Sequence, residues 1–188
     1  MKKIAILFSG TGSNFAYVVK HLHLKKCEVV VALTNNPQAK GIEIAKKHHI
    51  PLVVIDSKLY KQREKFDEVV VESLQKYMPD LTVLAGFMRI LTPTFTSQIK
   101  ALNLHPSLLP RHKGLNAIEK SYEDRFDEGG VSVHFVSSEL DGGDIILQKS
   151  VLKKGLSFKE YDTQIRTIEK EALVDAILTI LGDKNGKI

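Results

Sequence analysis

Short apolar runs alternate with helically spaced apolar residues along most of the chain, and this alternation restricts the possible folds more than any other feature. The apolar runs predict strands over residues 4–8, 27–33, 52–55, 81–85 and 101–104. Between them, apolar residues recur every three or four positions, which predicts helices over residues 15–22, 42–49 and 60–77. Strands that are apolar almost throughout are typical of a parallel sheet with helices on both faces. The sequence therefore predicts a doubly wound α/β fold.

The pattern changes after about residue 130. Residues 131–136 alternate between apolar and polar side chains, which predicts a strand, and a further strand is predicted over residues 145–151. Apolar residues then recur at helical spacing over residues 157–181. No linker interrupts the chain, so we expect one domain over residues 1–188, with a mainly parallel, Rossmann-like sheet, a C-terminal strand pair and a long final helix.

The composition narrows the class of protein. Hydrophobic residues make up 43% of the 188 residues and charged residues 26%, which excludes collagen-like and wholly disordered chains. Cys27 is the only cysteine, so an internal disulfide and a four-cysteine zinc site are impossible. No apolar run reaches the length of a signal peptide core or a membrane span, and we therefore expect a cytoplasmic protein with no membrane partner.

The net charge of +5 comes with lysines that are scattered in pairs along the chain. They form no basic stripe, and aromatic residues do not alternate with them as in proteins that bind single-stranded nucleic acid. We therefore expect no nucleic-acid partner. The surplus is typical of a solvated surface and leaves small anionic substrates open.

A loop with two glycines, Ser-Gly-Thr-Gly-Ser-Asn over residues 9–14, joins the first predicted strand to the first predicted helix. Backbone N–H groups at such a helix N-terminus can bind a phosphate. A dinucleotide site would need a third glycine where Phe15 stands, and an acidic residue at the end of the second strand, so NAD is disfavoured. Ser13 and Asn14 add side-chain donors that suit a terminal phosphomonoester. A plain turn with a capped helix is the alternative.

Asn103 and His105 lie at the end of the fifth predicted strand, two residues apart and therefore on one face. The carboxyl ends of parallel strands form the ligand crevice of an open sheet. An amide beside a histidine suits acyl transfer, because Asn103 could bind a developing oxyanion while His105 transfers a proton. Asp141, in an Asp-Gly turn, could stabilise the imidazolium if it reached His105. A turn cap at His105 and an ordinary turn at Asp141 remain open.

Glu169 lies on or beside the apolar stripe of the final predicted helix. A carboxylate in that position needs a partner, because burying an unpaired charge is costly. One partner that the spacing itself offers is a helix-edge pair with Arg166 or Lys170.

Together these motifs resemble the folate-dependent formyltransferases, and the similarity runs from residue 4 to about residue 181. It rests on SGTGSN (9–14), LAGFMRIL (84–91), NLHPSLLP (103–110), SVHFV (132–136) and DGGDIILQ (141–148). The first loop and the chain length select the glycinamide ribonucleotide branch. The resemblance implies an enzyme of purine biosynthesis that transfers the formyl group of its co-substrate, 10-formyltetrahydrofolate, to the primary amine of glycinamide ribonucleotide. The products would be formylglycinamide ribonucleotide and tetrahydrofolate, and no metal would be required.

The resemblance also implies roles for individual residues. The catalytic set would be His105 as proton donor, Asn103 as oxyanion donor and Asp141 as the positioning carboxylate that aids proton removal. The substrate would be bound through its phosphate by Gly12, Ser13 and Asn14, and through its ribose by Glu169. The folate would be bound by Arg63, Met88, Arg89, Ile90, Leu91, Ser137 and Leu140. Residues 1–100 would thus hold the substrate phosphate, and residues 101–181 the catalytic and folate-binding elements. The roles of His112 and Asn116 stay open, and His134 could either support a catalytic residue or be an ordinary strand histidine.

Other functions remain open at this point. Another enzyme that uses 10-formyltetrahydrofolate, such as a hydrolase or a sugar-amine formyltransferase, would share the same catalytic motif. A methionyl-tRNA formyltransferase would be expected to carry a further basic C-terminal domain. A non-catalytic nucleotide-binding module would keep the glycine loop and dispense with His105. In the favoured reading the partners are small molecules, a phosphorylated amine and a folate, and the protein is expected to be a monomer or a homodimer.

Overall fold

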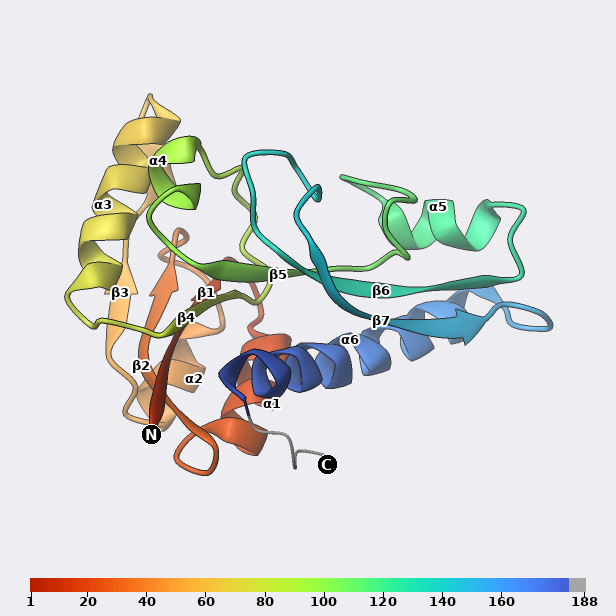
Figure 1. Cartoon of the computed structure of the whole chain (residues 1–188), viewed down its shortest axis with the longest axis horizontal. Coiled ribbons are helices and arrows are strands. Elements are labelled where there is room, and N and C mark those ends of the chain that lie inside the picture. Colours follow the sequence, from red (N-terminus) through yellow and green to blue (C-terminus); the bar gives the residue numbers. More distant parts are fainter. Residues whose placement is uncertain (183–188) are drawn as a thin grey trace. The chain divides into compact units, whose positions relative to one another are not determined.

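The computed structural model describes residues 1–182 and divides the chain into two compact units, Met1–Leu102 and a second unit that begins at Asn103 (Figure 1). Strand β5 (Ala101–His105) contains the boundary between the units. The expectation of a single domain stays a prediction, and its last six residues, 183–188, lie outside the described part.

The first unit is built from parallel strands and short helices. Its strands are β1 (Lys2–Phe8), β2 (Cys27–Thr34), β3 (Leu52–Val54) and β4 (Leu81–Leu84). Its helices are α1 (Ser13–Leu22), α2 (Ile42–Lys47), the 3-10 turn η1 (Ser57–Leu59), α3 (Arg63–Gln75) and α4 (Pro93–Thr96). Strand β1 pairs in parallel with β2 and β4, and β3 extends the sheet beyond β2. Residues 4–8 of β1 are fully buried, which explains why this part of the strand is apolar throughout.

The loops that follow β1 and β4 are bonded to each other through Ser9. The amide of Ser9 donates to the carbonyl of Gly86 over 2.9 Å, and its hydroxyl accepts the amide of Met88 over 2.8 Å. Since β1 and β4 are parallel neighbours, both loops leave the same edge of the sheet. The glycine loop and the segment after β4 are therefore held together within the first unit.

The second unit carries an antiparallel strand pair and the longest helix. Strand β6 (Glu128–Phe135) pairs with β7 (Ile145–Leu152), and the helices are α5 (Ala117–Glu123) and α6 (Phe158–Leu181). Helix α6 packs on both strands, and Ser157 and Glu160 form a reciprocal capping box at its start. Its Tyr161 is fully buried and lies so close to Gly129 of β6 that a side chain at that glycine would collide with the tyrosine hydroxyl.

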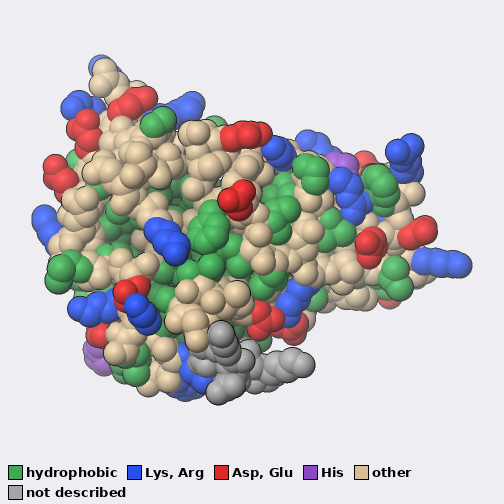
Figure 2. Space-filling view, viewed as in Figure 1, with side chains coloured by type: hydrophobic (Ala, Val, Ile, Leu, Met, Phe, Trp, Pro, Cys, Tyr) green, Lys and Arg blue, Asp and Glu red, His purple; other side chains and the backbone are tan. Residues whose placement is uncertain are grey.

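The strands are ordered β3-β2-β1-β4-β5-β6-β7 in one seven-stranded sheet. The predicted α/β class is therefore confirmed, with its mainly parallel sheet, its C-terminal strand pair and its long final helix. Among residues 1–182, no helix combines the length and the apolar character needed to cross a bilayer. Figure 2 shows lysine and arginine side chains dispersed over the visible face rather than gathered in a stripe.

Three helices differ from the sequence expectation. Helix α3 begins at Arg63, three residues after its predicted start, because residues 57–59 form a separate 3-10 turn capped by the Asp56 carboxylate. Helices α4 and α5 were not predicted. They are four and seven residues long, too short to repeat an apolar stripe.

Candidate active site

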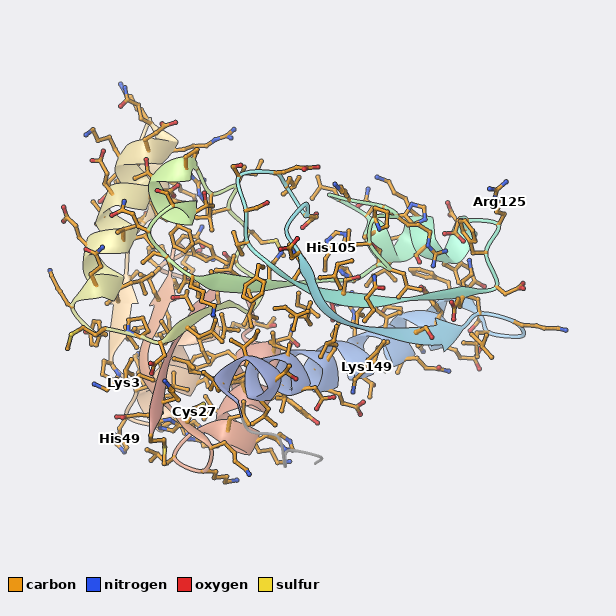
Figure 3. The ribbon with its side chains drawn as sticks, viewed as in Figure 1. Lys3, Cys27, His49, His105, Arg125 and Lys149 are labelled. Carbon is orange, nitrogen blue, oxygen red and sulfur yellow. The ribbon has the colours of Figure 1, made fainter. Side chains whose placement is uncertain are left out.

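His105 and Asp141 lie against each other in the second unit. His105 is the last residue of β5, where Figure 3 labels it, and is 6% exposed. Asp141 lies in the loop between β6 and β7, is 8% exposed, and has a left-handed backbone with a φ of 51°. The Nδ1 atom of His105 lies 3.3 Å from the Oδ2 atom of Asp141. The chain thus brings together two groups that are 36 residues apart, although their catalytic roles stay predictions.

A second histidine lies on the other oxygen of the same carboxylate. His134 of β6 is 2% exposed, and its Nε2 atom lies 3.5 Å from Asp141 Oδ1. Its Nδ1 atom is 2.8 Å from the carbonyl oxygen of Phe135, which can only accept a hydrogen bond. Asp141 therefore lies between two imidazole rings. The sequence alone assigned His134 no definite role. The one signal that could have identified it is the alternation of residues along β6, which places its side chain on a buried face of the strand.

The loop after Pro110 contacts both His105 and Asp141 through its main chain. The carbonyl oxygen of His112 is 2.8 Å from His105 Nε2, and the amide of Gly114 donates to Asp141 Oδ2 over 2.9 Å. A carbonyl oxygen only accepts, so Nε2 carries a hydrogen, while Nδ1 faces a carboxylate. Both nitrogens of His105 therefore face acceptors.

Charge around Asp141 favours its ionised form. Burial by itself raises the pKa of Asp141, but the contact from His134, the amide of Gly114 and the positive charge on the two histidines outweigh burial and lower it below its usual value. An ionised carboxylate against an imidazolium can orient the ring and hold its proton ready for transfer.

Asn103 lies two residues before His105 on β5, so the two side chains share a face of the strand. It is partly exposed, and within residues 1–182 its side chain makes no hydrogen bond. The amide group is therefore available to a ligand. Its expected role as oxyanion donor stays a prediction.

The predicted phosphate loop lies in the first unit. Gly12 has a φ of 74°, and a Cβ atom there would lie 2.8 Å from the Cα atom of Gly41, so both the backbone and the packing require glycine. Ser13 is exposed at the first position of α1. The Oδ1 atom of Asn14 is buried, with no hydrogen-bond partner among residues 1–182. No side chain caps α1, so the structure does not contain the capped turn offered as the alternative.

The segment after β4 exposes apolar side chains. Met88 is 75% exposed and Ile90 53%, whereas Leu91 is buried. The guanidinium of Arg89 lies 4.9 Å from the centroid of the Phe66 ring in α3. Neighbouring exposed apolar side chains are typical of a ligand-binding surface.

Three other predicted folate residues are also exposed or half-exposed. Arg63 is the first residue of α3 and is exposed, in the first unit. Ser137 and Leu140 lie in the loop between β6 and β7 of the second unit. The Ser137 hydroxyl donates to the carbonyl of Glu139 over 3.1 Å, and Leu140 is 50% exposed. Folate binding by these residues stays a prediction.

Glu169 is half-buried in α6 and makes no hydrogen bond or ion pair within residues 1–182. The nearby Arg166 instead pairs with Asp162 over 3.1 Å. Burial raises the pKa of Glu169 above its usual value, and Asp162 adds to this, while Arg166 and Lys170 oppose it. The helix-edge pair offered as an alternative is therefore not formed. Binding of the substrate ribose by Glu169 stays a prediction.

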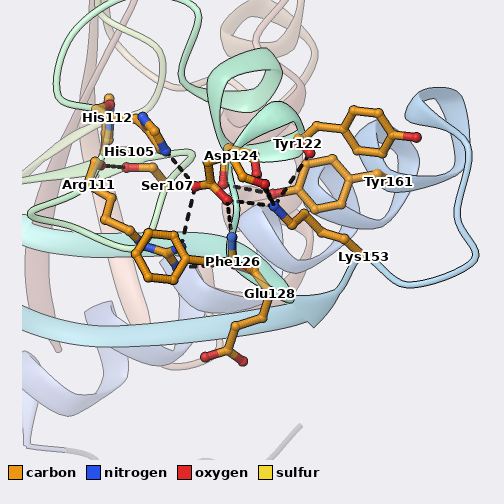
Figure 4. Close-up of polar contacts among 11 residues, drawn as sticks. His105, Ser107, Arg111, His112, Tyr122, Asp124, Phe126, Glu128, Lys153 and Tyr161 are labelled. Carbon is orange, nitrogen blue, oxygen red and sulfur yellow. Dashed lines mark hydrogen bonds and ion pairs between the residues drawn. The ribbon is translucent and has the colours of Figure 1, made fainter.

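Sequence reasoning missed a group of charged side chains around Asp124, which Figure 4 shows. We call Arg111, His112, Asp124 and Lys153 the Asp124 cluster. The Oδ1 atom of Asp124 lies 2.6 Å from Lys153 Nζ, and its Oδ2 atom lies 2.6 Å from His112 Nε2 and 3.4 Å from Arg111 Nη1. Burial by itself raises the pKa of Asp124, but bonds from Lys153, His112 and the amide of Phe126 lower it to about 2.

Replacing Asp124 with alanine is expected to lower the free energy of unfolding by about 3–5 kcal/mol, because Lys153 would be left buried without its carboxylate. The stability that Asp124 adds is present above its usual pKa of 3.8 and is lost as the pH falls towards 2. Urea unfolding between pH 7 and pH 2.5 measures both effects. Asp127→Ala, an exposed neighbour, should change stability by less than about 0.5 kcal/mol. Equal losses for both variants would contradict the expectation.

Among residues 1–182, no three His, Cys, Asp or Glu side chains are arranged to hold a metal ion. The candidate active site therefore consists of an amide, two imidazoles and a carboxylate in the second unit. The first unit, described by itself, contains a helix N-terminus at α1 and an exposed apolar segment after β4.

Comparison with known proteins gives a consistent result. The sequence profile of the formyl transferase family matches residues 2–177. The phosphoribosylglycinamide formyltransferase of Haemophilus influenzae is 41% identical over 155 residues, which cover 80% of this chain and 73% of that protein. The trifunctional purine biosynthetic protein adenosine-3 of Homo sapiens is 35% identical over 99% of this chain, which spans only 19% of that longer protein.

Solved structures are similar over almost the whole chain. The crystal structure of phosphoribosylglycinamide formyltransferase from Campylobacter jejuni has 49% sequence identity and a TM-score of 0.93, covering 96% of this chain and 97% of that one. Glycinamide ribonucleotide transformylase 1 from Geobacillus kaustophilus has 32% identity and a TM-score of 0.90, covering 96% and 99%. The matched profile spans more than nine-tenths of the sequence, and it includes the strand that ends at His105 and the loop that holds Asp141. This chain belongs to the formyl transferase family.

Proposed function

We propose that the protein transfers the formyl group of 10-formyltetrahydrofolate to the primary amine of glycinamide ribonucleotide, as an enzyme of purine biosynthesis. The observation that carries the proposal is the His105–Asp141 contact at the end of β5, with the unpartnered amide of Asn103 on the same strand. The names of the similar proteins support the choice of substrate.

The proposed reaction forms one bond at the formyl carbon and breaks another. The amine nitrogen of the substrate bonds to the formyl carbon, and Asn103 donates a hydrogen bond to the oxyanion of the resulting tetrahedral intermediate. The bond from this carbon to the folate nitrogen then breaks, and His105 supplies the proton that this nitrogen needs. The proton lost by the amine returns to the His105–Asp141 pair, so protons balance over the cycle. No metal ion is needed.

The substrate phosphate is proposed to bind at Gly12, Ser13 and Asn14. The first turn of α1 contains no acidic side chain, so the partial positive charge of the helix N-terminus is not neutralised. The buried Oδ1 atom of Asn14 has no partner among residues 1–182 and could accept a hydrogen bond from a ligand hydroxyl or a water. We propose that Met88 and Ile90 supply apolar contacts to the folate.

One assay separates formyl transfer from hydrolysis. Release of tetrahydrofolate from 10-formyltetrahydrofolate is followed spectroscopically, with and without glycinamide ribonucleotide. We expect release only when the ribonucleotide is present, together with an equal amount of formylated product. Equal release in its absence, with free formate as product, would instead identify a hydrolase. Both substrates are small molecules, and we propose that the enzyme acts on them in the cytoplasm.

Glu169→Gln is expected to raise the KM for glycinamide ribonucleotide about tenfold and to leave the KM for the folate unchanged, because a charged hydrogen bond to the ribose is lost. The raised pKa of Glu169 means that its charge destabilises the folded chain at neutral pH, and this cost disappears as the pH falls. The variant should therefore be at least as stable as the parent.

Steady-state kinetics and urea unfolding check both expectations. Glu171→Gln is the matched control, since this exposed side chain lies on the same helix 3.6 Å from Lys149. An unchanged KM for the ribonucleotide in Glu169→Gln would remove Glu169 from the proposed substrate site.

A further inference from the structure

The Asp124 cluster is connected to the candidate general acid through one residue. The side chain of His112 binds Asp124, and the main-chain carbonyl of the same residue accepts the hydrogen bond of His105 Nε2. Two contacts, of 2.6 Å and 2.8 Å, thus link a carboxylate outside the candidate active site to the ring inside it. Figure 4 shows the contacts of Asp124 with Lys153 and with the side chain of His112.

The position of the His112 carbonyl depends on these contacts. His112 has a φ of 55°, a left-handed conformation that is unfavourable for a residue with a Cβ atom. Such a conformation persists where neighbouring contacts hold it. Asp124 holds the side chain of His112 and that of the preceding Arg111, while the Ser107 hydroxyl donates to the carbonyl of Arg111. The main chain at residues 111–112 is therefore fixed from both sides.

The two oxygens of Asp124 have different partners. Oδ1 binds Lys153, which also donates to the carbonyls of Ser121 and Asp124 and is 8% exposed at its side chain. Oδ2 binds His112 and Arg111. The Lys153 contact holds Asp124 in place, and the other oxygen faces the loop that contacts His105. The contact with Lys153 thus fixes the carboxylate that binds the side chains of Arg111 and His112.

We propose that Asp124 is a positioning residue, which acts through His112 to hold the carbonyl that orients the ring of His105. This inference rests on the proposed function, because it assigns the loop a part in formyl transfer. The contact between the His112 carbonyl and Nε2 fixes the plane of the His105 ring, and in that orientation Nδ1 faces Asp141. Displacing the carbonyl by even about 1 Å would misalign the proton donor and slow the chemical step without weakening substrate binding.

His112→Ala tests the link while leaving Lys153 paired with Asp124. We expect kcat to fall about tenfold and both KM values to change less than about twofold, as for loss of a residue that orients another. His112→Gln places an amide N–H near the position of Nε2 and should restore most of kcat. Arg125→Ala, an exposed neighbour that lies over Phe126, should behave as the parent chain.

The ring of His105 gives a second measurement that needs no turnover. In the parent protein, the Nε2 proton is bonded to a carbonyl and should be observed by 15N–1H NMR as a slowly exchanging signal. His112→Ala should speed its exchange with water at least about tenfold, and His112→Gln should not. Unchanged kcat and exchange in His112→Ala would overturn the proposal, as would a Gln variant as impaired as the Ala variant. If the parent chain transfers no formyl group, the proposed function fails, and the exchange data alone then decide whether Asp124 positions the ring.

Discussion

His105→Ala is expected to lower kcat for formyl transfer by about 10³-fold. General acid–base catalysis typically contributes about 10²–10⁴ to an enzymatic rate. Alanine removes the proposed proton donor and its contact with Asp141 together, so the leaving folate nitrogen would have to take its proton from water. The KM values should change much less, because the ring contributes little to binding the ground state. Steady-state kinetics with both substrates at saturation measure this loss.

The folded state of His105→Ala should survive. The substitution removes two polar contacts, but Asp141 keeps the amide of Gly114 and the nearby ring of His134, so its carboxylate is not left alone. Circular dichroism and urea unfolding check that turnover is lost because the imidazole is missing and not because the protein is unfolded. His48→Ala, at an exposed histidine in the first unit, is the control and should keep full activity. A kcat for His105→Ala within tenfold of the parent value would remove His105 from the reaction.

The sequence predicted the strands well because a buried strand has a simple pattern of apolar residues. Residues 4–8 are fully buried, and a strand buried on both faces must be apolar throughout. Helix α4 has no comparable sequence pattern, because it is only one turn long and its first residues are held by a residue distant in the sequence. The Asp67 carboxylate accepts both the amide and the hydroxyl of Thr92, each over 2.7 Å, at the start of that helix. A cap supplied from 25 positions away cannot be identified from local sequence.

The candidate active site likewise has a part that the sequence predicts and a part that it does not. Asn103, His105 and Asp141 stand in motifs whose residue types indicate their chemistry. The contacts that orient His105 and Asp141 come largely from the main chain: the carbonyl of His112 and the amide of Gly114. Every residue except proline carries both groups, so no side-chain pattern marks them.

The Asp124 cluster escaped prediction for a different reason. Asp124 and Lys153 are 29 residues apart, and each resembles an ordinary surface charge in its local sequence. Whether such residues are paired and buried depends on how β6, β7 and α5 pack, which sequence alone does not determine.

Asp141→Asn should lower kcat by about 10²–10⁴-fold, close to the effect of losing His105 itself. Asparagine keeps the size of the side chain and an oxygen for the amide of Gly114, but it has no charge to stabilise an imidazolium on either side. Asparagine also tolerates the φ of 51° at this position, whereas alanine would add backbone strain and confuse a catalytic loss with a structural one. Asp144→Asn, an exposed residue of the same loop, is the matched control.

The pH dependence of stability tests the same residue without substrate. Because its pKa is lowered in the folded chain, Asp141 contributes stability that is present above its usual pKa of 3.8 and is lost as the pH falls below it. The parent protein should therefore lose stability on acidification more steeply than Asp141→Asn, which has no carboxylate to protonate. Urea unfolding from pH 7 to pH 3 measures the two slopes. Parallel slopes together with near-normal kcat would show that Asp141 neither carries charge against the histidines nor supports their proton transfer.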